Sequence, residues 1–185
     1  AVYYQWIEKM APDMFAEIQE MVKQGRWEIA GGWFLQPDCN IPSEESFMRH
    51  TLISQRYFKE KFGVTATSGY NVDSFGHNAG IPKILRAGGM DSYVFMRPSL
   101  TEQEREETVF QWESDDASSV TAFRISIRYN LNATSVHQLQ EIIDKANAEN
   151  QDMMAFYGVG NHGGGPTIRM LHTFNQLDRK ELRYS

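Results

Sequence analysis

The sequence predicts an α/β fold with a mostly parallel sheet, and three features of the chain support this prediction. Segments with helical spacing of apolar residues alternate with short apolar runs that are typical of buried strands. Polar residues and glycines gather where these runs end, as they do at the carboxyl ends of parallel strands. The 185 residues, 41% of them apolar and 23% charged, suffice for one domain with a genuine core. The alternation leaves open a closed or partly closed α/β barrel and an open doubly wound sheet.

The first elements are predominantly helical. Residues 2–10 form an amphipathic stretch, and Pro12 suits the first turn of a helix that extends to Lys23. Gly25 ends that helix, and residues 27–30 are predicted to form a strand. Ser43 is the expected N-cap of a long helix that ends at Gly63.

The middle of the chain contains most of the predicted strands. Residues 64–72 form an apolar-leaning run that predicts a strand, followed by a turn and a helix that ends at Gly88-Gly89. Three further strands are expected at residues 92–96, 109–112 and 120–127. Residues 101–107 are expected to be a charged surface loop, and a polar turn at 114–119 joins the last two strands.

The last third is predicted to contain a helix at residues 136–148, a buried strand at 153–159 and a helix that begins at Pro166. That final helix has apolar residues at helical spacing: Met170, Leu171, Phe174 and Leu177. No repeat or linker divides the chain, so residues 1–185 are expected to form a single domain.

The charge and the composition exclude several classes of protein. A net charge of −6 argues against nucleic-acid binding, which favours a basic surface. No apolar run approaches the ~20 residues of a membrane span, and no signal-peptide pattern opens the chain. The single cysteine, Cys39, excludes an internal disulfide and favours a reducing, cytoplasmic compartment. A complete α/β barrel takes about 250 residues, so we expect this chain to be a piece of a larger enzyme.

Asp73 is the residue that most invites a catalytic interpretation. It falls at the carboxyl end of the strand predicted at 64–72, where side chains of parallel α/β proteins project into the active-site cleft. A carboxylate there, beside Phe75 and His77, is a candidate nucleophile or metal ligand. The alternative is that Asp73 only caps the following helix.

Four ordered blocks carry a resemblance to a known family. They are Gly25–Ser46 with its Gly-Arg-Trp-Glu and Asp-Cys-Asn-Ile-Pro-Ser motifs, Arg49–Gly63, Asn71–Asn78 with Asp-Ser-Phe-Gly-His, and the glycine-rich Gly158–Thr167. Together they resemble the bacterial and cytosolic branch of the glycoside hydrolase family 38 α-mannosidases. The resemblance implies that the chain is part of a seven-stranded, mostly parallel α/β barrel, the N-terminal catalytic domain of such an enzyme.

The resemblance also implies a function. A retaining α-mannosidase would remove terminal α-linked mannose from oligosaccharides through a covalent mannosyl-enzyme intermediate, with Asp73 as nucleophile and as a ligand of zinc. The other zinc ligands of the family lie in motifs that this chain lacks, so we expect them outside it. The full-length enzyme is expected to be a homo-oligomer.

Three more residues match positions near the substrate in the family. Phe75 would line the sugar subsite, although by its chemistry alone it could equally be a core residue that anchors the turn. Arg97 would orient a carboxylate or a hydroxyl group through its guanidinium fork. His162 is expected to contact substrate. Asn161 stands where relatives often carry Asp, and an amide cannot donate the catalytic proton, so the general acid is either His162 or an acid elsewhere in the full enzyme.

Two other functions remain open from the residues alone. A metal-dependent polysaccharide deacetylase would also place Asp and His on a metal, but the one Asp-Asp pair, Asp115-Asp116, falls in a polar turn. A non-catalytic carbohydrate-binding module would need only the aromatic and polar surface.

Overall fold

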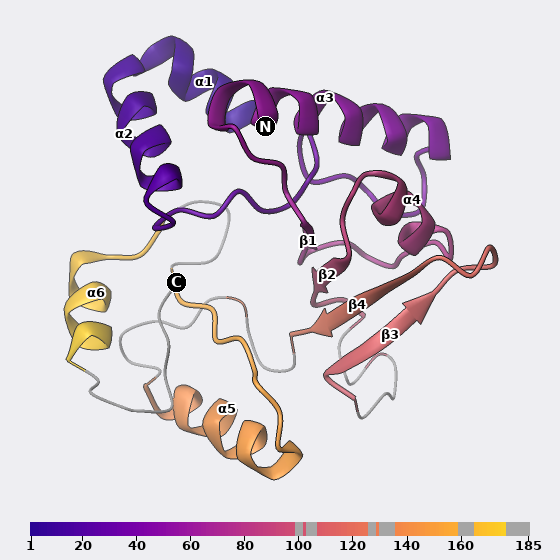
Figure 1. Cartoon of the computed structure of the whole chain (residues 1–185). Coiled ribbons are helices and arrows are strands. Elements are labelled where there is room, and N and C mark those ends of the chain that lie inside the picture. Colours follow the sequence, from indigo (N-terminus) through magenta and orange to yellow (C-terminus); the bar gives the residue numbers. More distant parts are fainter. Residues whose placement is uncertain (99–101, 103–106, 126–128, 130–135, 159–164, 177–185) are drawn as a thin grey trace. The chain divides into compact units, whose positions relative to one another are not determined.

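The structure is a computed structural model, and it describes residues 1–98, 102, 107–125, 129, 136–158 and 165–176. The chain separates into two compact units, Ala1–Arg124 and Ile125–Ser185. The expected single domain stays a prediction, and we describe each unit by itself (Figure 1).

The first unit contains a four-stranded sheet with the order β1-β2-β4-β3. Its strands are β1 (Ser68–Asn71), β2 (Ser92–Phe95), β3 (Val109–Glu113) and β4 (Ser119–Arg124). The pairs β1–β2 and β2–β4 are parallel, and only β3 runs antiparallel to its neighbour β4 (Figure 1). The prediction of an α/β fold with a mostly parallel sheet is therefore confirmed.

Four helices accompany this sheet: α1 (Val2–Met10), α2 (Pro12–Lys23), α3 (Glu44–Phe62) and α4 (Ile81–Ala87). The predicted helix 12–23 is correct, and so are both ends of the long helix α3. Ser43 Oγ accepts a hydrogen bond from the backbone N–H of Ser46 at 3.3 Å, which caps the amino terminus. Gly63 ends α3 in the left-handed region at φ +74°, which glycine adopts without steric cost.

Two apolar clusters stabilise the first unit. One lies where α3 and α4 pack on the sheet, and its fully buried members include Phe47, Ile84, Leu85, Met90 and Tyr93. The other joins α1, α2 and α3 through residues such as Phe15, Ile18, Phe58 and Phe62. The sheet and its helices thus form a packed scaffold, because α3 contributes to both clusters. The loops extend from the ends of its strands.

The second unit contains the helices α5 (Val136–Glu149) and α6 (Ile168–Asn175). Its buried cluster consists of Leu139, Ile142, Ile143, Met170 and Phe174. The helix α6 begins after Thr167 rather than at Pro166, because the Thr167 side chain accepts the Met170 N–H and caps the helix. Leu177 lies outside the described residues. Among the described helices, none combines the length and the apolar character needed to cross a bilayer.

Two predicted strands are wrong. Residues 27–30 are not a strand; only the next residue, Gly31, forms an isolated parallel bridge, with Gly69 of β1. Residues 153–158 form none of the four strands, and Met154 is 43% exposed. Met153 and Ala155 instead pack against the helical cluster of the second unit, so the run is apolar for a different reason.

The strand predicted at 64–72 is also shorter than expected, because only Ser68–Asn71 finds a partner in β2.

Candidate functional site

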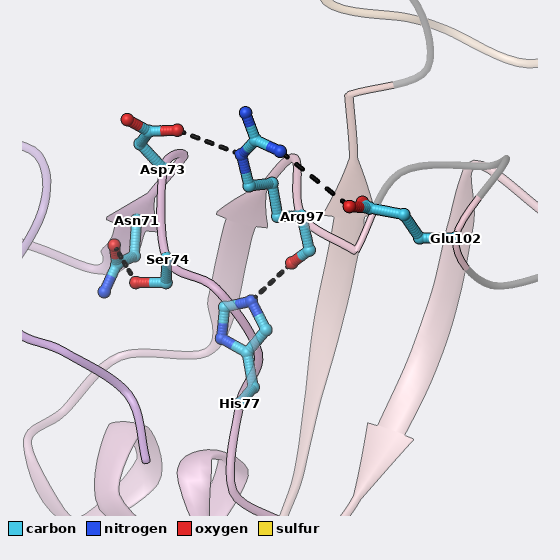
Figure 2. A network of polar contacts seen from close by, with 6 residues as sticks. All are labelled: Asn71, Asp73, Ser74, His77, Arg97 and Glu102. Carbon is cyan, nitrogen blue, oxygen red and sulfur yellow. Dashed lines mark hydrogen bonds and ion pairs between the residues drawn. The ribbon is translucent and has the colours of Figure 1, made fainter. Parts of the chain in front are cut away.

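The candidate site lies at the edge of the sheet where the parallel strands end. Asp73 follows β1 by two residues, and Arg97 follows β2 by two residues. Because β1 and β2 are parallel neighbours, their carboxyl ends reach the same edge. Arg97 Nε donates a hydrogen bond to Asp73 Oδ1 at 3.0 Å, so two residues that are far apart in the sequence meet here (Figure 2).

The Asp73–Arg97 ion pair is partly open to solvent. The Asp73 side chain is 47% exposed and that of Arg97 is 32% exposed. An ion pair of this kind contributes about 0–1 kcal/mol to stability, so it adds little to holding the fold together. What it does is orient the carboxylate: Oδ1 faces Arg97, and Figure 2 shows the second oxygen turned away from the guanidinium.

Phe75 forms an aromatic surface beside this pair. Phe75 is 74% exposed, so it is not part of the core formed by the described residues. The Arg97 Cζ atom lies 4.6 Å from the ring centroid, within the range of a cation–π contact. The ring thus lies next to the charged pair and leaves most of its surface open to a ligand.

A buried polar network holds the loop that carries Asp73. Ser74 Oγ donates to Asn71 Oδ1 at 2.6 Å, and Asn71 Nδ2 donates to the Pro37 carbonyl at 3.0 Å and to Cys39 Sγ at 2.8 Å. Asn71, Ser74 and Cys39 are all buried, and burial raises the pKa of the Cys39 thiol. A buried network that satisfies its polar groups is rigid, and Asp73 stands between two of its members.

A second loop, residues 37–40, fastens the other end of the same turn. Asn78 Nδ2 donates to the Cys39 carbonyl at 2.7 Å, and Asn40 Nδ2 donates to the Phe75 carbonyl at 3.2 Å. Gly76 lies at φ +104°, and a Cβ added there would come 2.7 Å from Asn40 Nδ2. The positive φ favours glycine at this position, and an added Cβ would also displace the Asn40 amide that donates to the Phe75 carbonyl.

Asp38 starts that second loop but serves its backbone. Asp38 Oδ1 accepts the N–H groups of Asn40 and Ile41, at 2.8 and 2.9 Å, and these bonds, with Ile41 the larger contributor, lower the pKa of the Asp38 carboxyl. This is an Asx turn, and the carboxylate needs no ligand to explain it.

The described residues do not form a zinc site. Within the part of the chain that the structure describes, no three His, Cys, Asp or Glu side chains come together in a way that could hold a metal. Asp73 alone is one carboxylate, and a catalytic zinc takes about three protein ligands. Asn161 and His162 lie outside the described residues, so the structure does not place the expected general acid.

Several residues that support the site were not predicted from the sequence. Tyr93 is fully buried on β2 and its hydroxyl group reaches the His77 ring, and the polar side chains of Cys39 and Asn71 face each other. Arg124, 2% exposed, ends β4 in register with Phe95 of β2. The sequence signal was a polar side chain within or beside a short apolar strand, and this does not reveal which distant residue is its partner.

Comparison with known proteins shows which protein family the chain is similar to. The model of the family described as "Glycosyl hydrolases family 38 N-terminal domain" matches residues 1–185. Alpha-mannosidase G of Dictyostelium discoideum is 34% identical over 182 residues, covering 94% of this chain and 16% of the relative. Alpha-mannosidase 2C1 of Homo sapiens is 28% identical, covering 96% of this chain and 17% of the relative. The chain therefore spans about a sixth of the length of these curated relatives.

Two solved structures share the fold. The α-mannosidase from Enterococcus faecalis V583 has a TM-score of 0.58 at 21% identity, over 66% of this chain and 14% of its own. The 4-alpha-glucanotransferase from Thermococcus litoralis has a TM-score of 0.62 at 20% identity, over 92% of this chain and 27% of its own. At such identities the likeness concerns the fold alone.

Proposed function

Because this chain belongs to glycosyl hydrolase family 38, whose N-terminal domain model spans all of it, we propose that it is part of a retaining α-mannosidase with Asp73 as the nucleophile. One observation carries the assignment of Asp73. Its carboxylate lies at the carboxyl edge of a parallel sheet, with Oδ1 held by Arg97 and the exposed ring of Phe75 beside it. Family membership also favours this reaction over that of a polysaccharide deacetylase.

In the proposed reaction, a carboxylate oxygen of Asp73 attacks the anomeric carbon of a terminal α-mannoside. The bond from that carbon to the leaving oxygen breaks, a general acid protonates this oxygen, and a mannosyl ester of Asp73 forms. Water then attacks the same carbon, the residue that acted as acid now accepts its proton, and Asp73 leaves as a carboxylate. Two inversions give net retention of configuration.

Arg97 and Phe75 have supporting roles in this proposal. The hydrogen bond to Oδ1 sets the orientation of the carboxylate before substrate arrives, so less reorganisation is needed during attack. The exposed Phe75 ring offers a flat surface for the C–H face of a pyranose. We assign the general acid to His162, since histidine is a residue type whose ordinary pKa lies near neutrality and the neighbouring Asn161 has no acidic proton; an acid elsewhere in the full enzyme is the alternative.

Further parts of the proposal concern the whole enzyme. We propose that this chain contributes to a single seven-stranded α/β barrel and that the enzyme is a cytoplasmic homo-oligomer, in line with the one cysteine, Cys39, being a free thiol. Zinc, if bound, would use Asp73 as one ligand and would grip sugar hydroxyl groups. Its remaining ligands would come from outside the described residues. The α-mannoside oligosaccharide is the only partner that the proposed chemistry requires.

The test uses the full-length protein and the substitution Asp73→Asn. We expect turnover of an aryl α-mannoside to be abolished without loss of fold, and a fluorinated mannosyl fluoride to label Asp73 covalently in the wild type. Asp91→Asn is the matched control, because Asp91 precedes β2 and so lies at the amino ends of the parallel strands, away from Asp73. We expect this substitution to leave turnover intact. An early product of inverted configuration by NMR refutes the retaining mechanism, and full activity of Asp73→Asn refutes the assignment of the nucleophile.

A further inference from the structure

We propose that His77 is a positioning residue that holds the main chain of Arg97 so that the guanidinium group meets Asp73. The inference rests on the proposed function, because the position of Arg97 affects catalysis only if Asp73 is the nucleophile. His77 belongs to the same turn as Asp73 and contacts the main-chain carbonyl of Arg97, whereas Asp73 contacts the guanidinium group (Figure 2).

The hydrogen bonds of His77 determine its tautomer. Nε2 lies 2.7 Å from the Arg97 carbonyl oxygen, and a carbonyl can only accept, so Nε2 must carry the proton. Nδ1 is then the acceptor, and the Tyr93 hydroxyl group, 3.1 Å away, donates to it. Both nitrogens are therefore engaged, one by a main-chain atom at the site and one by a side chain of the core.

Aromatic rings enclose the imidazole and fix its plane. It makes edge-to-face contacts with Tyr93, Phe95 and Trp112, with ring centroids at 5.6, 5.1 and 5.9 Å. Such contacts between rings favour a defined relative orientation. Rotation of His77 away from Arg97 would break these contacts together with both hydrogen bonds.

Burial keeps the protonation states that this arrangement needs. It lowers the pKa of His77, with the Arg97 carbonyl partly opposing the shift, so the neutral ring with a free lone pair on Nδ1 is favoured. Burial also raises the pKa of Tyr93, which therefore retains the hydrogen that it donates. Tyr93 is 0% exposed, and its hydroxyl oxygen lies 3.7 Å from the buried Cys39 Sγ. The hydrogen bond between His77 and the Arg97 carbonyl is thus connected, through Tyr93, to buried residues of the core.

Arg97 needs this support because the sheet no longer holds it. The last parallel pair of β2 is Phe95 with Arg124, and Arg97 lies two residues further along. The turn that follows β1 contacts Arg97 at three points: Asp73 Oδ1 receives its Nε–H, the Phe75 ring lies against its guanidinium group, and His77 donates to its carbonyl oxygen. One turn thereby sets both the carboxylate and the backbone from which its partner extends.

The test compares two substitutions of His77 in the full-length enzyme. His77→Phe keeps a ring of similar size and removes both nitrogens, whereas His77→Gln keeps a donor near the position of Nε2. We expect His77→Phe to lower kcat/KM for an aryl α-mannoside by about 100-fold, mainly through kcat, since a displacement of about 1 Å can have this effect. His77→Gln recovers at least about tenfold of the loss, because its amide reaches the Arg97 carbonyl.

His50→Leu is the control, because His50 also contacts an aromatic ring, Phe34, but lies on α3 away from the site. Crystal structures of the variants give a readout that does not depend on activity. The contact of 3.0 Å between Arg97 Nε and Asp73 Oδ1 is expected in the wild type and in His77→Gln, and lost in His77→Phe. If His77→Phe does not fold, His77→Asn replaces it, since its amide is too short to reach Arg97.

The inference is overturned if the Arg97–Asp73 contact is retained in His77→Phe. It is also overturned if His77→Gln and His77→Phe are equally active. If the wild-type enzyme does not hydrolyse α-mannosides, the proposed function fails. The crystallographic comparison then still decides whether His77 positions Arg97.

Discussion

Gly69 is the position in β1 where one added methyl group has the clearest expected effect. A Cβ at Gly69 would lie 2.5 Å from Leu85 Cδ2 and 2.9 Å from Tyr93 Cδ2, and both of those side chains are 0% exposed. Gly69 does not adopt a positive φ, so the backbone accepts alanine without strain. Overpacking of a core costs about 1–3 kcal/mol. Replacing a strand glycine returns about 0.5–1 kcal/mol. We expect Gly69→Ala to destabilise the first unit by about 1–2 kcal/mol.

Leu85 provides the decisive comparison. Leu85→Ala alone should cost about 2–5 kcal/mol, because the side chain is fully buried. It also removes the atom closest to the new methyl group. In that background Gly69→Ala should therefore cost less, with a coupling energy of about 1 kcal/mol between the two sites.

The assay is urea denaturation followed by tryptophan fluorescence, with Ser68→Ala as the control. Ser68 is the neighbouring residue of β1, is only half-buried, and its loss should change stability by no more than about 0.5 kcal/mol. A neutral Gly69→Ala, or strict additivity with Leu85→Ala, would refute the steric argument.

Three further predictions concern charge, metal and the general acid. Hydrogen bonds from Lys61, the larger contributor, and from Tyr57 lower the pKa of Glu8 below its ordinary value of 4.5. The stability that these contacts add is therefore fully present above pH 4.5 and is lost as the pH falls through the lowered pKa. Glu8→Gln should thus destabilise the chain near neutral pH but not in acid, and urea titrations at both pH values check this; an equal cost at both would contradict it. The 185-residue chain alone should fold at least partly, bind no stoichiometric zinc and show no mannosidase activity; mass spectrometry showing one zinc per chain, together with turnover, would disprove this. His162→Ala in the full-length enzyme should slow aryl mannosides with poor leaving groups about 10²–10⁴-fold and activated ones far less; equal losses on both would indicate a binding or structural role.

The elements that the sequence predicts well are those with local signals. Pro12, Ser43 and Gly63 act on the turn of helix next to them, and the helix ends lie where these residues indicate. Strands depend on partners elsewhere in the chain. Residues 27–30 have the composition of a strand, yet only Gly31 meets the sheet, through Gly69. An apolar run therefore shows where a chain can be buried, not with what it pairs.

The candidate site also contains residues that the sequence predicts and residues that it does not. Asp73 could be predicted because it follows a strand, and Arg97 because it matches a family position near the substrate. The parallel strands bring the two residues together. The buried polar contacts behind them could not be predicted. The bond between Asn71 and Cys39 joins residues 32 positions apart, and neither residue differs in sequence from an ordinary turn or core residue. His162 remains a prediction, since it lies outside the described residues.

The order of the strands has a consequence for the growing chain during synthesis. β3 is made before β4, yet β4 is its neighbour in the sheet and separates it from β2. Until Arg124 has emerged, β3 has no described strand to pair with. The turn between the two is short, so a hairpin can close within microseconds of the arrival of β4, far faster than residues are added. We therefore expect β4 to pair with β2 as part of a complete β3–β4 hairpin, after β1 and β2 have paired with each other.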